Sequence, residues 1–218
     1  METIKKKIHN QKVDVLCSGP SVKNFVPENR ICIVPNRSIY LPQLQDQQYQ
    51  YDYIIWVIGT GWKKKLILEW LIEICKALKV LPDAILLRTT KQNKGPVFDH
   101  AKTALERTFR DKPVMIDILY QHIKPYGLIS TGMSCVKLGV DCECQEIVVS
   151  GMEMGINTKY CTSLTDKGII SKYGYSSGCS HLLNDISCFK GMIGAHIISP
   201  DKNSGLFQFL KITNNSIF

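Results

Sequence analysis

The stretch Val15–Phe25, VLCSGPSVKNF, joins an apolar run directly to a tight polar turn. Its first three residues favour a buried strand, and Ser18, Gly19, Pro20 and Ser21 follow at once. Small residues after a strand let a ligand approach the backbone closely, and glycine also tolerates a positive φ. The stretch therefore predicts a strand that ends at a binding turn, with a plain tight turn as the alternative.

Similar apolar runs, each closed by a turn or a polar residue, recur along the chain. They span residues 12–18, 30–35, 51–58, 83–89, 146–151 and 195–199. Helical periodicity lies between them, from Trp62 to Val80, from Val97 to Arg110, and from Thr131 to Leu138, where Gly139 is expected to end the helix. This alternation predicts an α/β fold: a Rossmann-like, doubly wound, mostly parallel sheet with helices on both faces.

The 218 residues fit a single domain spanning 1–218. No apolar segment suits a membrane span or a signal peptide, so we expect a cytoplasmic protein, with a basic tail around His9. The 27 basic and 19 acidic residues give a net charge of +8. This excess favours an anionic partner: nucleic acid, a nucleotide-bearing substrate or an acidic membrane surface. The charge is scattered and has few aromatic residues among it, so no specific nucleic-acid partner is indicated.

The cysteines indicate reduced thiols. The chain has nine of them, an odd number, without C-x-x-C spacing, which argues against a disulfide framework or a zinc site. Cys142 and Cys144 form only a C-x-C pair, which leaves metal binding as a minor alternative.

Polar residues follow several of the predicted strands. In doubly wound sheets, ligands bind at the carboxyl ends of strands, where the winding direction reverses. The candidates are Ser18, Gly19, Pro20 and Ser21 after the first strand, Asn36 after the second, Ser130, Thr131 and Gly132 at a helix start, and Ser150, Gly151 and Glu153 after a later strand. A helix start with hydroxyls suits an anion. Turn formation, helix capping and a solvated carboxylate are the ordinary alternatives.

Taken in order, these stretches resemble the bacterial sialyltransferases of glycosyltransferase family 42, which modify lipooligosaccharides. The family's G-N-G-P-S-L corresponds to Cys17–Val22, its C-N to Pro35-Asn36, its I-T-S-G to Ile129–Gly132, its L-S-G-I-D to Val149–Glu153, and its H-S-K-N-T-D to His181–Asp185. The resemblance covers most of the chain. No single motif is specific, and neither G-x-G-x-x-G nor G-x-x-x-x-G-K-[ST] is present.

The resemblance implies a GT-A-like variant of the Rossmann fold with a flexible lid around residues 155–180. It implies inverting, metal-independent transfer of sialic acid from CMP-sialic acid to a bacterial cell-surface glycan such as lipooligosaccharide, O-antigen or capsule. No cofactor is implied, and the lack of a D-x-D motif agrees with metal independence. The implied partners are the CMP-sugar donor and a glycan or glycolipid acceptor. Such an enzyme could lie peripherally on the cytoplasmic face of the inner membrane, and its oligomeric state is left open.

The resemblance implies that His181 is the general base, although it could also be a surface histidine. The sequence departs from the family at Leu128, where the family has arginine, and at Gly59, where it has asparagine. The two family tyrosines beside the leaving phosphate have no aligned counterpart. Candidates from the lid are Tyr160, Tyr173 and Tyr175. These departures keep open a CMP-Kdo-type donor, and a non-catalytic nucleotide- or nucleic-acid-binding Rossmann module is the alternative from another class.

Overall fold

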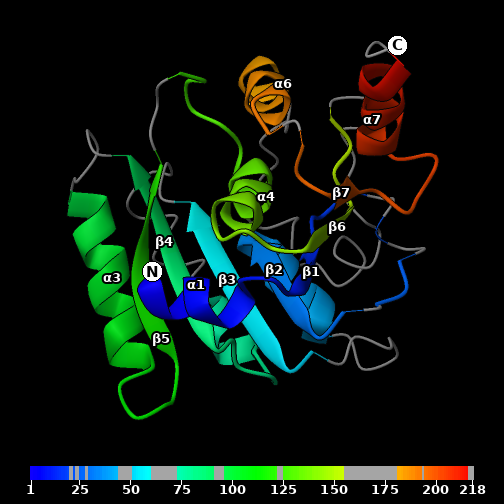
Figure 1. Ribbon diagram of the computed structural model, residues 1–218. Helices are drawn as coiled ribbons and strands as arrows, with labels where there is room; N and C mark the ends of the chain where they lie inside the picture. Colours follow the sequence, from blue (N-terminus) through cyan, green and yellow to red (C-terminus); the bar gives the residue numbers. More distant parts are fainter. Residues whose placement is uncertain are drawn as a thin grey trace.

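A seven-stranded, all-parallel sheet forms the centre of the computed structural model, within the residues that it describes (Figure 1). Those residues are 1–19, 22, 25–27, 29–43, 51–59, 73–90, 96–121, 125–154, 181–192 and 194–215. The strands are β1 (Lys12–Leu16), β2 (Ile31–Pro35), β3 (Tyr53–Gly59), β4 (Ala84–Thr90), β5 (Met115–Gln121), β6 (Glu146–Ser150) and β7 (Ile197–Ile198). The helices are α1 (Glu2–Ile8), the 3-10 helix η2 (Asn36–Gln43), α3 (Pro96–Thr108), α4 (Thr131–Asp141), α6 (Leu182–Lys190) and α7 (Gly205–Asn215).

Two apolar clusters cover the two faces of the sheet. On one face, residues of α1, α4, α6 and α7 pack on alternate strand residues such as Val15 and Ile33. On the other face, residues of α3 and η2 pack on the intervening ones, including the fully buried Trp56. Strands covered on both faces need almost continuous apolar runs, which is the pattern that the sequence carries. The predicted doubly wound α/β fold is confirmed.

The winding of the chain reverses between β1 and β6. From β1 the chain adds β2, β3, β4 and β5 one after another on one side, and then returns to place β6 on the other side of β1. Leu16 at the end of β1 lies opposite Ser150 at the end of β6. The carboxyl ends of these two strands are therefore the edge at which doubly wound folds bind ligands.

Several element boundaries differ from the predicted ones by one or more residues, as three examples show. β1 ends at Leu16, so Cys17 and Ser18 belong to the following turn. α4 runs through Gly139 to Asp141, because this glycine makes room for the side chain of Ile147 and does not end the helix. Of the helix predicted from Trp62 to Val80, residues 73–77 are helical and 78–80 are not, while 62–72 lie outside the described residues.

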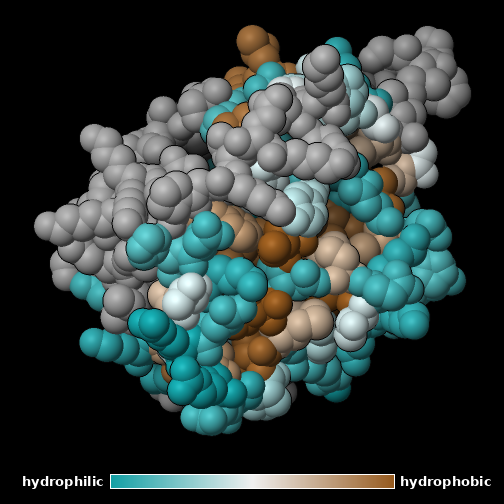
Figure 2. All heavy atoms as spheres, turned by 90° about the vertical axis from the view of Figure 1, so that its left-hand side faces the viewer, coloured by the Kyte–Doolittle hydropathy of each residue, from teal (hydrophilic) through white to brown (hydrophobic). Residues whose placement is uncertain are grey.

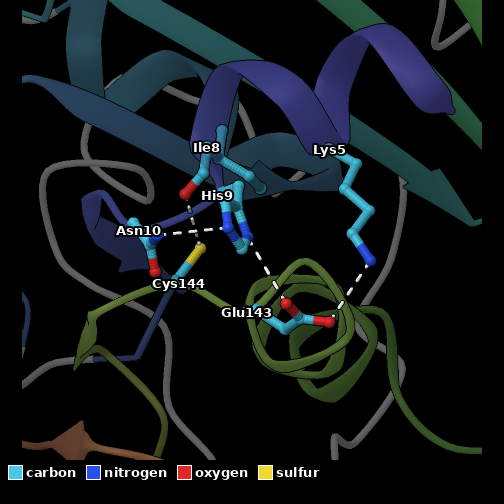
Figure 3. A network of polar contacts seen from close by, with 6 residues as sticks. All are labelled: Lys5, Ile8, His9, Asn10, Glu143 and Cys144. Carbon is cyan, nitrogen blue, oxygen red and sulfur yellow. Dashed lines mark hydrogen bonds and ion pairs between the residues drawn. The ribbon is translucent and has the colours of Figure 1, made fainter.

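The predicted basic tail is wrong, because residues 2–8 form the docked helix α1. Ile4 and Ile8 are fully buried against the sheet. Figure 3 shows the polar contacts that fasten the end of α1 to Glu143: Lys5 Nζ lies 3.3 Å and His9 Nδ1 lies 3.5 Å from its carboxylate oxygens. The backbone N–H of Asn10 also donates to the carbonyl of Glu143 at 3.0 Å. The helix therefore lies at the amino ends of the strands, away from the ligand edge.

Strand β5, which the sequence analysis did not predict, forms one edge of the sheet. Most of its side chains are half-buried. Figure 2 views the molecule from this side and shows hydrophobic atoms visible between hydrophilic ones. Among the described residues, no helix is both long enough and apolar enough to cross a bilayer.

Candidate functional site

The turn after β1 runs alongside the end of β6. The backbone N–H of Cys17 donates to the Ser150 carbonyl at 2.8 Å, and that of Gly19 donates to the Gly151 carbonyl at 2.9 Å. Gly151 has a φ of +73°, and an added Cβ there would lie 2.2 Å from the Cys17 carbonyl oxygen. The sequence thus brings four of its predicted site residues, Ser18, Gly19, Ser150 and Gly151, to the point where the winding reverses.

Glu153 fills the space beside Gly19. An added Cβ on Gly19 would lie 2.6 Å from the Glu153 Cγ and 2.5 Å from the Gly151 carbonyl oxygen. Glu153 is 9% exposed, and its Oε2 accepts from the backbone N–H of Gly205 at 3.4 Å, at the start of α7. The expectation of a solvated carboxylate is therefore wrong. Gly19 is needed because the protein's own Glu153 approaches it, and the left-handed φ belongs to Gly151 and not to Gly19.

The start of α4 forms the second part of the site. Ser130 caps the helix, with its Oγ accepting from the Met133 N–H at 3.1 Å. Beside it, Asn36 adopts a φ of +46° and accepts the N–H of Gly59 through Oδ1 at 2.9 Å. An added Cβ on Gly59 would lie 2.6 Å from Thr131 Oγ1. The predicted residues Asn36 and Thr131 thus meet around Gly59, where a larger side chain would crowd Thr131.

A buried guanidinium lies at the same place, and the sequence analysis missed it. Arg88, at the end of β4, is 8% exposed. Its Nη1 donates to the Ile129 carbonyl at 2.6 Å and to Ser134 Oγ at 3.1 Å. Its Nη2 lies 3.6 Å from the position of an added Cβ on Gly59. Leu128 stands where the resembled family has arginine. Arg88, on β4, places its guanidinium against the backbone carbonyl of Ile129, the residue that follows Leu128.

Helix α6 carries His181 and is fastened to the start of α4. The Ser130 N–H donates to Asp185 Oδ1 at 2.7 Å, and Asn184 Nδ2 donates to the Leu128 carbonyl at 2.9 Å. These two side chains hold the segment before α4, and His181 is the N-cap residue of α6 without a side-chain capping bond. Since Asp185 is one helical turn from His181, the histidine lies near the start of α4.

The charges around Asp185 link these groups electrostatically. Burial raises the pKa of the Asp185 carboxyl above its ordinary value, while the bonds from Ser130 and the charges of His181 and Arg88 act in the opposite direction. Burial likewise lowers the pKa of the Arg88 guanidinium, which Asp185 partly opposes. His181, Asp185 and Arg88 therefore share one electrostatic environment.

The two parts of the site meet at Cys17. An added Cβ on Gly132, in the first turn of α4, would lie 3.0 Å from Cys17 Sγ. Burial raises the pKa of the Cys17 thiol to about 12, and the charges of Asp185 and Glu153 act in the same direction. Cys17 is therefore protonated at neutral pH and is no nucleophile. The predicted reduced thiols are confirmed for the seven described cysteines, Cys17, Cys32, Cys75, Cys135, Cys142, Cys144 and Cys188, all of which are free.

Some predicted site residues lie outside the described residues, as does the predicted lid around 155–180. They are Pro20, Ser21, Tyr160, Tyr173 and Tyr175. Within the described part of the chain, no three His, Cys, Asp or Glu side chains are grouped to hold a metal ion. The described candidates lie along the carboxyl ends of β1, β2, β4 and β6 and at the start of α4. Figure 1 shows α6, whose N-cap residue is His181, above α4.

Comparisons with protein-family models and with curated proteins find no match to the chain. A comparison with solved structures does. The fold matches that of a monofunctional alpha-2,3-sialyltransferase, Cst-I, from Campylobacter jejuni. The TM-score is 0.59 at 16% sequence identity, and the match covers 90% of this chain and 78% of the other. At this identity the likeness establishes the fold, which agrees with the fold that the motif order implies.

Proposed function

We propose that the chain is a glycosyltransferase that moves a sialic acid or a related ulosonic acid from a CMP-activated donor to a bacterial cell-surface glycan. The observation that carries the proposal is the meeting of the predicted motifs at one edge. Residues from four distant stretches, around 18, 36, 131 and 151, lie together where the winding reverses. The likeness to a sialyltransferase fold supports the same reading.

The charges at this edge suit an anionic donor. A CMP-ulosonate carries a phosphate and a carboxylate. In a metal-independent enzyme, both anions must be stabilised by positively charged side chains, hydroxyls or N–H donors. The start of α4 supplies N–H groups and the hydroxyls of Ser130 and Thr131, and Arg88 supplies a buried positive charge beside them. We propose that these groups hold the donor's anions, in place of the arginine that the family has at Leu128.

The attacking acceptor hydroxyl must lose a proton as it displaces CMP. We propose that His181 takes this proton, because a ring nitrogen of a neutral imidazole can accept one and His181 lies near the start of α4. The displacement would be inverting and independent of metal. The acceptor would be lipooligosaccharide, O-antigen or capsule, with the enzyme lying peripherally on the cytoplasmic face of the inner membrane.

Ligand-induced stabilisation tests the proposal. We expect CMP or CDP at about 100 times its dissociation constant to add about 2.7 kcal/mol of stability, and so to raise the unfolding temperature by about 5–10 °C. NAD, AMP and oligonucleotides should give no shift of this size. If cytidine nucleotides give no shift at millimolar concentration, the proposal is wrong.

A screen of CMP-sugars with product masses would then identify the donor, including CMP-Kdo. Activity should survive EDTA, and a loss of activity that Mg²⁺ or Mn²⁺ restores would contradict the metal-independent mechanism. A chain that binds CMP but transfers none of the sugars tested would favour the non-catalytic nucleotide-binding module.

A further inference from the structure

A cavity of about 310 Å³ lies beside the ends of β6 and β7, and no predicted role accounts for most of its lining. It is lined by Phe25, Ser150, Pro200, Asp201 and Lys202. Its volume falls at the lower end of the range for small-molecule sites. The apolar ring of Phe25 and that of Pro200 can contact a flat ligand face, while the other three side chains offer hydrogen bonds.

Ser150 presents a buried hydroxyl to this cavity. The residue is 1% exposed, and its Oγ has no hydrogen-bond partner in the described structure. A buried hydroxyl without a hydrogen-bond partner is unfavourable, so such groups are usually satisfied by a ligand or by water. Ser150 points to the face opposite α4, since Val148, two residues earlier in the strand, packs in the same apolar cluster as Phe25.

The loop after β7 holds Asp201 firmly. Asp201 Oδ1 accepts the backbone N–H of Asn203 at 2.8 Å, and the Asp201 carbonyl accepts that of Ser204 at 2.9 Å. Ser204 in turn is fully buried, bonds Ser199 through the two hydroxyls at 2.6 Å, and accepts the N–H of Phe207 at 3.0 Å. The carboxylate of Asp201 is therefore fixed relative to β7 and α7 before any ligand binds.

We propose that this cavity binds the cytosine ring of the donor and that Asp201 determines the base specificity. This inference rests on the proposed function, which supplies the cytidine nucleotide. The N4 amine of cytosine donates a hydrogen bond to a carboxylate. The O4 of uracil is itself an acceptor, so it would be repelled by the carboxylate. Asp201 accepts from the amine, and Ser150 Oγ or Lys202 donates to a ring acceptor. The ribose and phosphate then lead over the turn after β1 toward the start of α4.

Asp201→Asn tests the carboxylate with little effect on the fold, because an asparagine amide oxygen can still accept the Asn203 N–H. Titration calorimetry with CMP and UMP should show that the wild-type chain prefers CMP. The variant should bind CMP about 10- to 100-fold more weakly and lose most of the preference. Asp111→Asn, an exposed carboxylate between α3 and β5 at the opposite edge of the sheet, is the matched control and should change neither affinity.

Ser150→Ala gives an independent test, because stability and binding should change in opposite directions. Removing an unsatisfied hydroxyl should leave the unfolding free energy unchanged or raise it, while CMP binding weakens by about 2- to 10-fold. If both variants keep wild-type CMP affinity and preference, the base lies elsewhere although the proposed function stands. If the wild-type chain binds no cytidine nucleotide at all, the proposed function fails and this inference with it.

Discussion

At Gly19, the close contact that the sequence predicted for a ligand is made by the protein's own Glu153 and Gly151. An added Cβ would lie 2.5 Å from the Gly151 carbonyl oxygen, which is backbone and cannot move without shifting β6. The Glu153 side chain, 2.6 Å away, would have to move as well. The glycine therefore couples the turn after β1 to the turn after β6, and any ligand at this edge depends on both.

We expect Gly19→Val to weaken CMP binding as well as stability, whereas an ordinary packing defect lowers stability alone. Overpacking costs about 1–3 kcal/mol of stability. Because the added atoms also displace Glu153 and the β6 turn, we expect a clear loss of CMP affinity, measured by titration beside urea unfolding. Gly139→Val on α4 is the control: an added Cβ there would lie 2.8 Å from the Ile147 side chain on β6, away from the carboxyl ends of the strands. A Gly19→Val chain that melts earlier with normal CMP affinity would show that the turn is purely structural.

His181→Ala tests the proposed general base. Its side chain makes no capping bond to α6, so the substitution should leave the fold intact. We expect kcat to fall by about 10²- to 10⁴-fold while CMP still binds, because the donor contacts lie on other strand ends. Any rise of kcat/KM with pH that reports the proposed base should disappear in the variant. His196→Ala, at the amino end of β7 beside Glu146, should leave kcat unchanged. Turnover within about threefold of wild type would place the base elsewhere.

Among the helices, α4 and α6 act as a pair because Asp185 accepts the Ser130 N–H across 55 positions of sequence. Burial raises the pKa of the Asp185 carboxyl. A carboxyl with a raised folded-state pKa contributes stability that is fully present below its unfolded value of about 3.9 and is lost as the pH rises through the folded value. Ionisation of the Asp185 carboxyl therefore lowers the stability of the α4–α6 junction.

Asp185→Asn should remove this dependence, because the amide oxygen can accept the same N–H without a charge. The stability difference between the variant and the wild-type chain should grow in favour of the variant from pH 4 upward and then level off. Urea unfolding at several pH values between 4 and 7 measures it. A difference that stays constant over this range would show that Asp185 titrates normally.

The elements that the sequence predicted are the ones whose burial is uniform. Strands β1 to β4 and β6 lie inside the sheet and carry mostly apolar, mostly buried runs, so they were found to within a few residues. Edge strand β5 was missed, since its side chains are mostly half-buried, among them Asp117, and Tyr120 is exposed. Helix α1 was missed because only Ile4 and Ile8 of its seven residues are buried, among three lysines.

The site was predictable only where polar residues follow strands or begin a helix. Asn36 and Ser150 could be identified in the first way, because a strand followed by a polar turn is visible locally. Ser130 was identified from the helix start that it caps. Arg88 could not be identified, since it lies within an apolar run and its partners are on α4 and the segment before it. Its one signal was a charged residue inside a strand that had to be buried on both faces. The contact between Glu153 and Gly19 could not be predicted either, because the two residues lie far apart in the sequence and meet only in the fold.

Across the whole molecule, the packing of α1 and the proposed ligand site lie at opposite ends of the strands. The candidate residues lie at the carboxyl ends of the strands, whereas α1 closes the amino ends through its contacts with Glu143 and with the ring of Tyr53, 5.1 Å from Lys7 Nζ. A change in the packing of α1 should therefore affect folding without touching the ligand. This separation distinguishes a weakened fold from a weakened site.

Ile8→Ala tests the separation. Ile8 is fully buried in the cluster on the α4 face, so losing its side chain should cost about 2–5 kcal/mol of unfolding free energy. Because the domain is expected to unfold cooperatively, the unfolding temperature should fall by about 5–15 °C. At a temperature where both chains are folded, CMP affinity should equal that of the wild-type chain, in contrast to Gly19→Val. A parallel loss of CMP affinity in Ile8→Ala would show that the amino edge and the ligand edge are coupled through the sheet.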